Sequence, residues 1–169
     1  MDLTEQDIYF LSIAKEWAMV SPCLSRGIGA VVVNKNGNIL GAGNNSWNDG
    51  FHGCSNEMVC PRKTKGFKSG EGLDTCPAIH AEVNAILRST SSGDFIWGSS
   101  LYCWCGVPCK WCAGIIVNAG IKKVYCFDDR SVGSISYIAL GEKILQECGV
   151  EIITYSKEFV EEKFLDMEK

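Results

Sequence analysis

Two short motifs, each at the start of a predicted helix, constrain the fold of this chain more than any other feature. The first carries His80 and Glu82, and the second carries Cys109 and Cys112. Residues three apart on a helix point the same way, so both thiols face one direction. Imidazole and thiolate are ordinary zinc ligands, and a helix N-terminus lowers the pKa of a thiol. A fold that joins these groups around one metal must bring two helix starts together.

This donor set favours a catalytic zinc over a structural one. A structural zinc usually takes four protein ligands, whereas His80, Cys109 and Cys112 leave a fourth position for water. Zinc lowers the pKa of such a water toward about 7, and Glu82 can move its protons. The alternative is that Cys109 and Cys112 belong to a four-ligand structural zinc with other cysteines, and that Glu82 is a solvated helix residue. The order His-x-Glu followed by Pro-Cys-x-x-Cys is typical of zinc deaminases and favours catalysis.

Hydrophobic periodicity predicts the order helix, strand, strand, followed by three alternations of helix and strand and a last helix. Asn36-Gly37 between two apolar runs predicts a hairpin, and helices between the later strands make those strands parallel. The fold class is therefore α/β, with helices covering a mixed sheet. The predicted helices are 5–19, capped by Thr4, 79–87, 109–118, 135–147 and 159–167, and the predicted strands are 29–34, 39–43, 101–105, 124–127 and 150–154.

Residues 44–76 lose this periodicity and are rich in Gly, Asn, Cys and Lys. An irregular stretch of this length is uncommon inside a compact domain unless it has a function. We therefore expect residues 1–169 to form a single domain with a functional insertion at about 44–76.

Composition excludes several classes of protein. With 46% hydrophobic and 21% charged residues the chain is ordinary for a globular protein, and no apolar run approaches the length of a membrane span. The first residues do not resemble a signal peptide, so we expect a cytoplasmic protein, and its ten cysteines indicate metal binding rather than a disulfide framework. The net charge of -4 weighs against a long nucleic-acid partner, but a small anionic substrate needs only a local basic cluster.

The residues from His80 to Ile86 and from Pro108 to Ala113, with Ile28–Val33 and Gly120–Val124, resemble the cytidine/deoxycytidylate deaminase family. Within that family the resemblance is to deoxycytidylate (dCMP) deaminases of bacterial and phage type. It implies a three-layer α-β-α fold with a five-stranded mixed sheet and the zinc under two helix starts. It also implies hydrolysis of dCMP to dUMP and ammonia, which supplies dUMP for dTMP synthesis, by a homo-oligomer, often a hexamer.

Carried over by residue, the resemblance makes His80, Cys109 and Cys112 the ligands of the catalytic zinc and Glu82 the proton shuttle. It implies that Asn45 contacts the sugar, although an asparagine there can also simply shape a turn. Ser25 and Arg26 fall where relatives carry residues near the 5′-phosphate, although a lone arginine is more often solvated. Ala81, inside the first motif, is a further substrate-contact candidate.

The cysteines of the insertion form a second candidate site. Cys54, Cys60 and Cys76, with His52 nearby, resemble a second, structural zinc site of some relatives. A polar, Gly-rich loop cannot bury enough surface to order itself, whereas a metal can hold it. The alternative is free thiols and an ordinary loop histidine. The remaining cysteines are predicted to be small core residues: Cys23, Cys103, Cys105, Cys126 and Cys148.

Other functions stay open from the sequence. A different deaminase of the same fold would act on cytidine, a modified dCMP, a purine base or adenosine in tRNA, and a binding module stabilised by zinc would catalyse nothing. The Gly43-Asn44-Asn45-Ser46 segment differs from the Gly-Tyr-Asn-Gly of relatives regulated by dCTP, so the resemblance leaves control by dCTP open. Trp104 either stacks on a base or fills the core, and core is the more frequent fate of a strand tryptophan.

Overall fold

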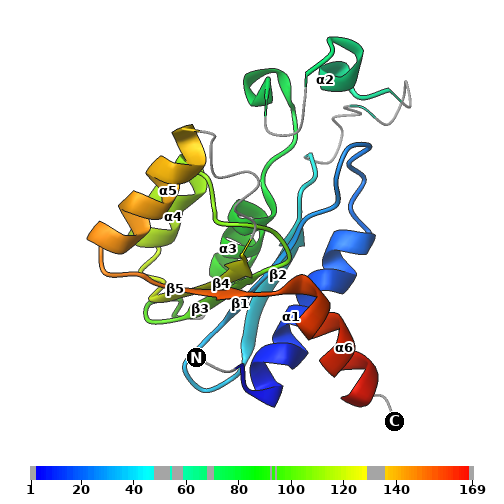
Figure 1. The fold of residues 1–169 in the computed structure, drawn as a ribbon. Helices are drawn as coiled ribbons and strands as arrows, with labels where there is room; N and C mark the ends of the chain where they lie inside the picture. The colour runs from blue at the N-terminus through cyan, green and yellow to red at the C-terminus, as the bar shows by residue number, and fades with distance from the viewer. Residues whose placement is uncertain are drawn as a thin grey trace.

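A five-stranded mixed sheet with helices on both faces organises the structure, a computed structural model that describes residues 3–47, 54, 59–67, 71–91, 93, 95–128 and 136–167 (Figure 1). The strand order is β2-β1-β3-β4-β5. The strands are β1 (Gly29–Val33), β2 (Ile39–Asn44), β3 (Ser100–Cys103), β4 (Lys123–Phe127) and β5 (Glu151–Tyr155). The helices are α1 (Glu5–Met19), α2 (Pro61–Thr64), α3 (Ala81–Ser91), α4 (Lys110–Asn118), α5 (Ser136–Glu147) and α6 (Lys157–Met167), with a short 3-10 turn η1 (Leu73–Thr75).

The predicted fold class is confirmed, down to the mixed character of the sheet. β1 pairs antiparallel with β2 and β3, whereas β3, β4 and β5 are parallel to one another. The hairpin turns at Gly37, whose φ of 82° lies in the left-handed region that glycine adopts readily. The side chain of Asn34 accepts the N–H groups of Asn36 and Asn38 and closes the turn. Local chemistry therefore explains the antiparallel edge of the sheet.

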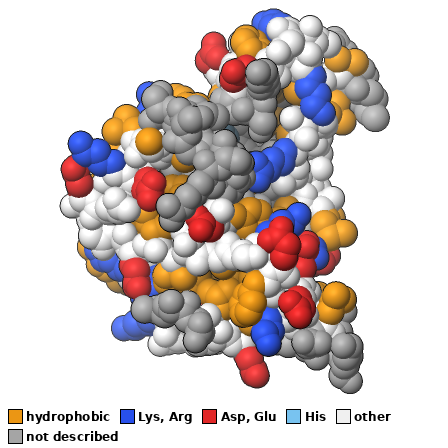
Figure 2. Space-filling model, viewed as in Figure 1, with side chains coloured by type: hydrophobic (Ala, Val, Ile, Leu, Met, Phe, Trp, Pro, Cys, Tyr) orange, Lys and Arg blue, Asp and Glu red, His pale blue; other side chains and the backbone are white. Residues whose placement is uncertain are grey.

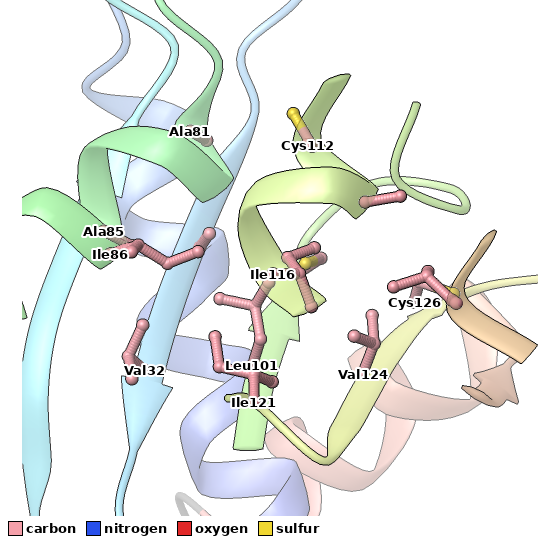
Figure 3. Close-up of a cluster of buried hydrophobic side chains, with 14 of the residues drawn as sticks. Val32, Ala81, Ala85, Ile86, Leu101, Cys112, Ile116, Ile121, Val124 and Cys126 are labelled. Atoms are coloured by element: carbon pink, nitrogen blue, oxygen red, sulfur yellow. The ribbon is translucent and has the colours of Figure 1, made fainter. Parts of the chain in front are cut away.

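Alternate residues of β1 face two separate cores. Ala30 and Val32 belong to the cluster that α3, α4 and α5 cover, and Figure 3 shows Val32 beneath side chains of α3 and α4. Val31 and Val33 face the opposite cluster, under α1 and α6. The predicted cap of α1 is also confirmed, because Thr4 Oγ1 accepts the Asp7 N–H while the Thr4 N–H donates to Asp7. The molecule is therefore a three-layer α-β-α arrangement.

The insertion adds little regular structure. Between β2 and α3 the structure describes only α2 and η1 as helical, and Figure 1 shows both beyond the upper end of the sheet. The predicted helix 79–87 begins two residues later and ends four residues later, because Ile79 is used in an extended bridge with Ser46. The sequence predicted His80 in the first turn of this helix, whereas in the structure His80 precedes that turn. No helix in the described ranges combines the length and hydrophobicity that crossing a membrane requires.

Candidate active site

The first part of the site is fixed by the junction of β2 and α3. Ser46 and Ile79 exchange two backbone hydrogen bonds of 3.1 and 2.7 Å, which hold the residue before His80. The Asn84 amide on α3 donates to the Asn44 carbonyl at 2.8 Å. At Gly43 an added Cβ would lie 2.8 Å from the Ala85 nitrogen, so only glycine allows α3 to pack this closely on β2. These contacts place the start of α3 at the end of the sheet.

The second part is the start of α4. Cys109 has an extended backbone conformation and occupies the N-cap position, so its thiol stands at the positive end of the helix dipole. Gly141 of α5 packs against this turn, since an added Cβ would lie 2.2 Å from the Pro108 carbonyl oxygen and 2.8 Å from the Cys109 carbonyl carbon. The backbone that carries Cys109 is therefore held from behind by α5.

The two helix starts meet as the sequence predicted. His80 Nδ1 lies 3.2 Å from Cys112 Sγ and 3.5 Å from Cys109 Sγ, and the two sulfurs are 3.7 Å apart. Among the described residues these three form the one group of three or more potential metal ligands whose donor atoms all lie within 4.8 Å of one another. Cys112, labelled in Figure 3 in the first turn of α4, is 1% exposed.

The electrostatics of the three groups are those of a metal-free donor set sharing protons. The hydrogen bond with Cys109 raises the pKa of His80 to about 9 against the opposing effect of burial. The hydrogen bond from Cys112, assisted by His80, lowers the pKa of Cys109 to about 4. The bond to Cys109, and then burial, raise the pKa of Cys112. The protons stored on His80 and Cys112 are those that a cation would displace.

These residues fit a zinc ion. One imidazole nitrogen and two sulfurs, largely buried and within one cation's reach, are a zinc donor set with a position left for a non-protein ligand. Glu82 is 4% exposed and does not belong to the group of donors. Burial raises the pKa of its carboxyl, against the opposing effect of His80. The site thus combines three ligands with one acid that remains available for proton transfer.

Zinc binding to the metal-free protein at pH 7 is expected to release about two protons. His80 and Cys112 have raised pKa values and are protonated at this pH, whereas Cys109, at about 4, is already a thiolate. Calorimetric titration with zinc in buffers of different ionisation enthalpy measures this number. Release of fewer than two protons would contradict the raised pKa values of His80 and Cys112.

A cavity opens in front of the donors and collects most of the predicted site residues. Its lining includes His80, Glu82 and Cys109. Ser25, Arg26 and Asn45, the predicted substrate contacts, line the same cavity. Ala81, in contrast, is fully buried in the core cluster against the sheet and is not among the lining residues. Six residues chosen from separate parts of the sequence therefore share one space.

Asn45 is held by the protein itself. Its Oδ1 accepts the Ile28 N–H at 2.8 Å and lies 2.7 Å from the Ser21 hydroxyl, and its Nδ2 donates to the Arg26 carbonyl at 2.9 Å. These bonds define which end of the amide is oxygen, and they leave one amide N–H for another acceptor. Asn45 therefore shapes the loop that carries Arg26, as the alternative interpretation held, and its sugar contact stays a prediction.

Replacing Asn45 with alanine is expected to lower the free energy of unfolding by about 1–3 kcal/mol, because buried backbone partners lose their hydrogen bonds. The matched control is Asn118→Ala, since Asn118 makes a single exposed bond to the Gly114 carbonyl. Urea denaturation of both variants measures the difference. Equal effects would show that the Asn45 bonds do not stabilise the fold.

The second predicted metal site is not assembled by the described residues. The thiols of Cys54, Cys60 and Cys76 do not form a group within 4.8 Å of one another, and His52 lies outside the described residues. Cys76 instead lines the cavity in front of the catalytic donors. The second zinc therefore remains a prediction from resemblance.

The structure shows how deeply the remaining cysteines and Trp104 are buried. The structure joins no two of the described cysteines in a disulfide. Cys103, Cys105 and Cys126 are buried as predicted, but Cys23 is half-buried and Cys148 is exposed. Cys148 is misassigned because it follows the last turn of α5, where the chain faces solvent. Trp104 is buried in the second core cluster, as the more frequent fate of such a residue suggested.

Sequence reasoning missed four residues that the structure places at the site. Arg62 and Tyr137 line the cavity, Asn84 ties α3 to β2, and Gly141 supports Cys109. Arg62 lies in the irregular insertion, and Tyr137 is a solitary aromatic residue near the start of a helix. For Gly141 a signal was available, because glycine inside an otherwise helical pattern often marks close packing.

The fold and the donor set together define a zinc-dependent deaminase site, and comparison with known proteins identifies the family. Residues 4–128 match the "Cytidine and deoxycytidylate deaminase zinc-binding region". The chain belongs to this family of cytidine and deoxycytidylate deaminases.

Two deoxycytidylate deaminases are similar to this chain in sequence, and a solved dCMP deaminase is similar to it in structure. The chain is 38% identical over 129 residues to the deoxycytidylate deaminase of Mycobacterium phage D29, covering 73% of this chain and 95% of the phage protein. It is 33% identical over 150 residues to that of Schizosaccharomyces pombe, covering 88% of this chain but 44% of the yeast protein. The crystal structure of dCMP deaminase from the cyanophage S-TIM5 in complex with dCMP and dUMP is similar with a TM-score of 0.70 and 30% identity, covering 92% of this chain and all of that one.

Proposed function

We propose that this protein hydrolyses dCMP to dUMP and ammonia in a zinc-dependent reaction. The observation that carries the proposal is the buried carboxyl of Glu82 in the cavity that the zinc donors His80 and Cys109 also line. The similarity to phage enzymes that bear the name dCMP deaminase supports the choice of substrate. The product dUMP would supply the synthesis of dTMP.

Zinc, when bound by His80, Cys109 and Cys112, supplies a water molecule acidified toward neutral pH. The chain itself contributes the proton transfers. Glu82 accepts a proton from the attacking water, passes it to a ring nitrogen of cytosine and then assists the departure of the amine as ammonia. Burial raises the pKa of Glu82, which brings the carboxyl nearer to the pH at which it can both accept and return a proton.

The other polar residues that line the cavity suit the rest of a nucleotide. Ser25 and Arg26 offer a hydroxyl and a guanidinium for a 5′-phosphate, and the remaining Asn45 N–H offers a donor for the sugar. Because these polar and basic groups are confined to the cavity, they suit a small anionic substrate. Figure 2 shows acidic and basic side chains interspersed over the visible face rather than gathered into one basic surface.

Ammonia release from the zinc-loaded protein tests the proposal directly. Incubation with dCMP, CMP, deoxycytidine, cytidine, guanine and tRNA is expected to yield ammonia most rapidly from dCMP. Ammonia from another of these compounds, with none from dCMP, would show that the substrate is a different one and that the reaction is still a deamination. No ammonia from any of them would favour a non-catalytic zinc-binding module and overturn the proposal.

The same proposal covers the whole chain and its setting. Residues 1–169 would act as one deaminase domain, in the cytoplasm where nucleotide pools are made, and as a homo-oligomer such as a hexamer. Sedimentation of the zinc-loaded protein distinguishes a monomer from an oligomer. A monomer with full activity would contradict the proposed homo-oligomer.

A further inference from the structure

The hydroxyl of Tyr155 reaches across the sheet to the strand that leads into the active site. Tyr155 is the last residue of β5 and is 5% exposed. Its hydroxyl donates to the carbonyl oxygen of Cys103, the last residue of β3, at 2.7 Å. In the sheet, β4 lies between these two strands. Burial raises the pKa of Tyr155, so the hydroxyl keeps its proton and remains a donor.

The ladder between β3 and β4 is interrupted at the end of β3. Tyr102 pairs with Tyr125 in parallel register. A regular ladder would continue by giving the Phe127 N–H to the Cys103 carbonyl. The Phe127 N–H donates instead to the Cys105 carbonyl, at 2.7 Å. The chain after β3 therefore advances past one carbonyl without a matching advance in β4, which is a bulge.

Tyr155 satisfies the carbonyl that the interrupted ladder passes over. The Trp104 N–H donates to the Gly29 carbonyl of β1 at 2.8 Å. Because backbone groups of successive strand residues alternate in direction, the carbonyl of the preceding Cys103 points the other way, toward β4. A buried carbonyl without a partner is costly, and the Tyr155 hydroxyl is its partner here. The hydroxyl therefore stabilises the bulge against the regular ladder.

The residues that follow the bulge form a wall of the cavity. Cys105, Gly106 and Val107 line it, and the same segment leads into the start of α4. Trp104 faces the opposite side of the sheet, in the core cluster under α1 and α6. The segment is thus held by the aromatic core on one side and faces the cavity on the other. A change of register at Cys103 would move the cavity wall.

We propose that Tyr155 is a positioning residue for deamination, because its hydroxyl holds the bulge after β3 and thereby places the cavity wall formed by residues 105–107. The inference rests on the proposed function and deepens it. Tyr155 is not one of the residues described as lining this cavity, so it acts on the substrate only through the segment that it holds. Without the hydroxyl, the Cys103 carbonyl can take the Phe127 N–H, which draws residues 105–107 along the strand.

Replacing Tyr155 with phenylalanine removes the hydroxyl and keeps the ring beside Phe127 and Trp104. In the zinc-loaded protein KM for dCMP is expected to rise roughly 5- to 20-fold with kcat little changed, because the cavity wall shifts while Glu82 stays. The affinity for dUMP, measured by calorimetry, should fall by a similar factor. A merely structural role would lower the amount of folded enzyme and the apparent kcat, but would leave KM unchanged.

Tyr102→Phe is the matched control. Tyr102 is also 5% exposed and directly precedes Cys103, but its hydroxyl donates to Asp7 of α1 at 2.8 Å. This variant should lose comparable stability in thermal unfolding and keep its KM. Para-aminophenylalanine in place of Tyr155 restores a donor on the ring, so KM should return toward that of the unmodified protein.

Backbone amide signals of the isotope-labelled protein locate the change. In Tyr155→Phe the signals of residues 105–107 and of Phe127 should shift, and in Tyr102→Phe they should stay. Unchanged KM and dUMP affinity in Tyr155→Phe, or an equal rise of KM in Tyr102→Phe, would overturn the positioning role.

The calorimetric and amide measurements do not depend on turnover. An unmodified protein that releases no ammonia from dCMP would refute the proposed reaction. Shifted amide signals and weakened dUMP binding in Tyr155→Phe would still show that Tyr155 places the cavity wall, so the two failures are distinguishable.

Discussion

Replacing Glu82 with glutamine is expected to lower kcat for dCMP deamination by about 10³-fold or more while zinc stays bound. The amide keeps the size of the side chain but can neither accept the proton of water nor return it to the ring and the leaving amine. Zinc should remain, because Glu82 does not belong to the group of metal donors. The change therefore removes proton transfer and little else.

Ammonia release and zinc content, measured on the same preparations, check this result. Asp74→Asn is the matched control, since Asp74 lines a neighbouring hollow that His80 also lines, and it is exposed to solvent. It should retain activity close to that of the unmodified protein. Retained activity in Glu82→Gln, or loss of its zinc, would contradict the assigned role. The rate of the unmodified enzyme should fall as the pH drops through the raised pKa of Glu82, because the reaction begins with the carboxylate.

Replacing Gly141 with alanine is expected to weaken zinc binding about 10- to 100-fold, although Gly141 contacts no metal. The new Cβ would lie 2.2 Å from the Pro108 carbonyl oxygen and 2.9 Å from the Lys110 nitrogen, and both are backbone atoms. Either α5 moves away or the start of α4 shifts, and the second response displaces Cys109. Overpacking of this kind also lowers stability by about 1–3 kcal/mol.

The control for this prediction lies on α4 itself. Gly114 has no atom within 4 Å of an added Cβ, so Gly114→Ala meets open space. Alanine is the better helix former, and this variant should be more stable by roughly 0.5–1 kcal/mol with unchanged zinc affinity. Competition with a zinc chelator and thermal unfolding measure both quantities. If the two alanine variants bind zinc alike, the support of Cys109 by α5 is not what positions the ligand.

Local features of the sequence predicted most of the secondary structure. The Thr4 cap, the Asn36-Gly37 turn and the apolar periodicity act over a few residues, so they can be recognised without knowing the fold. The zinc donors were also predictable, because histidine and paired cysteines at helix starts have few other uses. The exact start of α3 was not, since the bridge between Ser46 and Ile79 depends on a distant strand.

What the sequence by itself determined is the chemistry: a histidine, two cysteines and a glutamate in an order that suits zinc and proton transfer, on an α/β fold. Only the tertiary structure decided what surrounds that chemistry. Gly141 matters because α5 returns to the turn of Cys109, and Arg62 lines the cavity although it lies in the irregular stretch between β2 and α3. Contacts between segments distant in the chain have no periodicity or spacing to reveal them, since they arise when helices and loops pack on a common sheet.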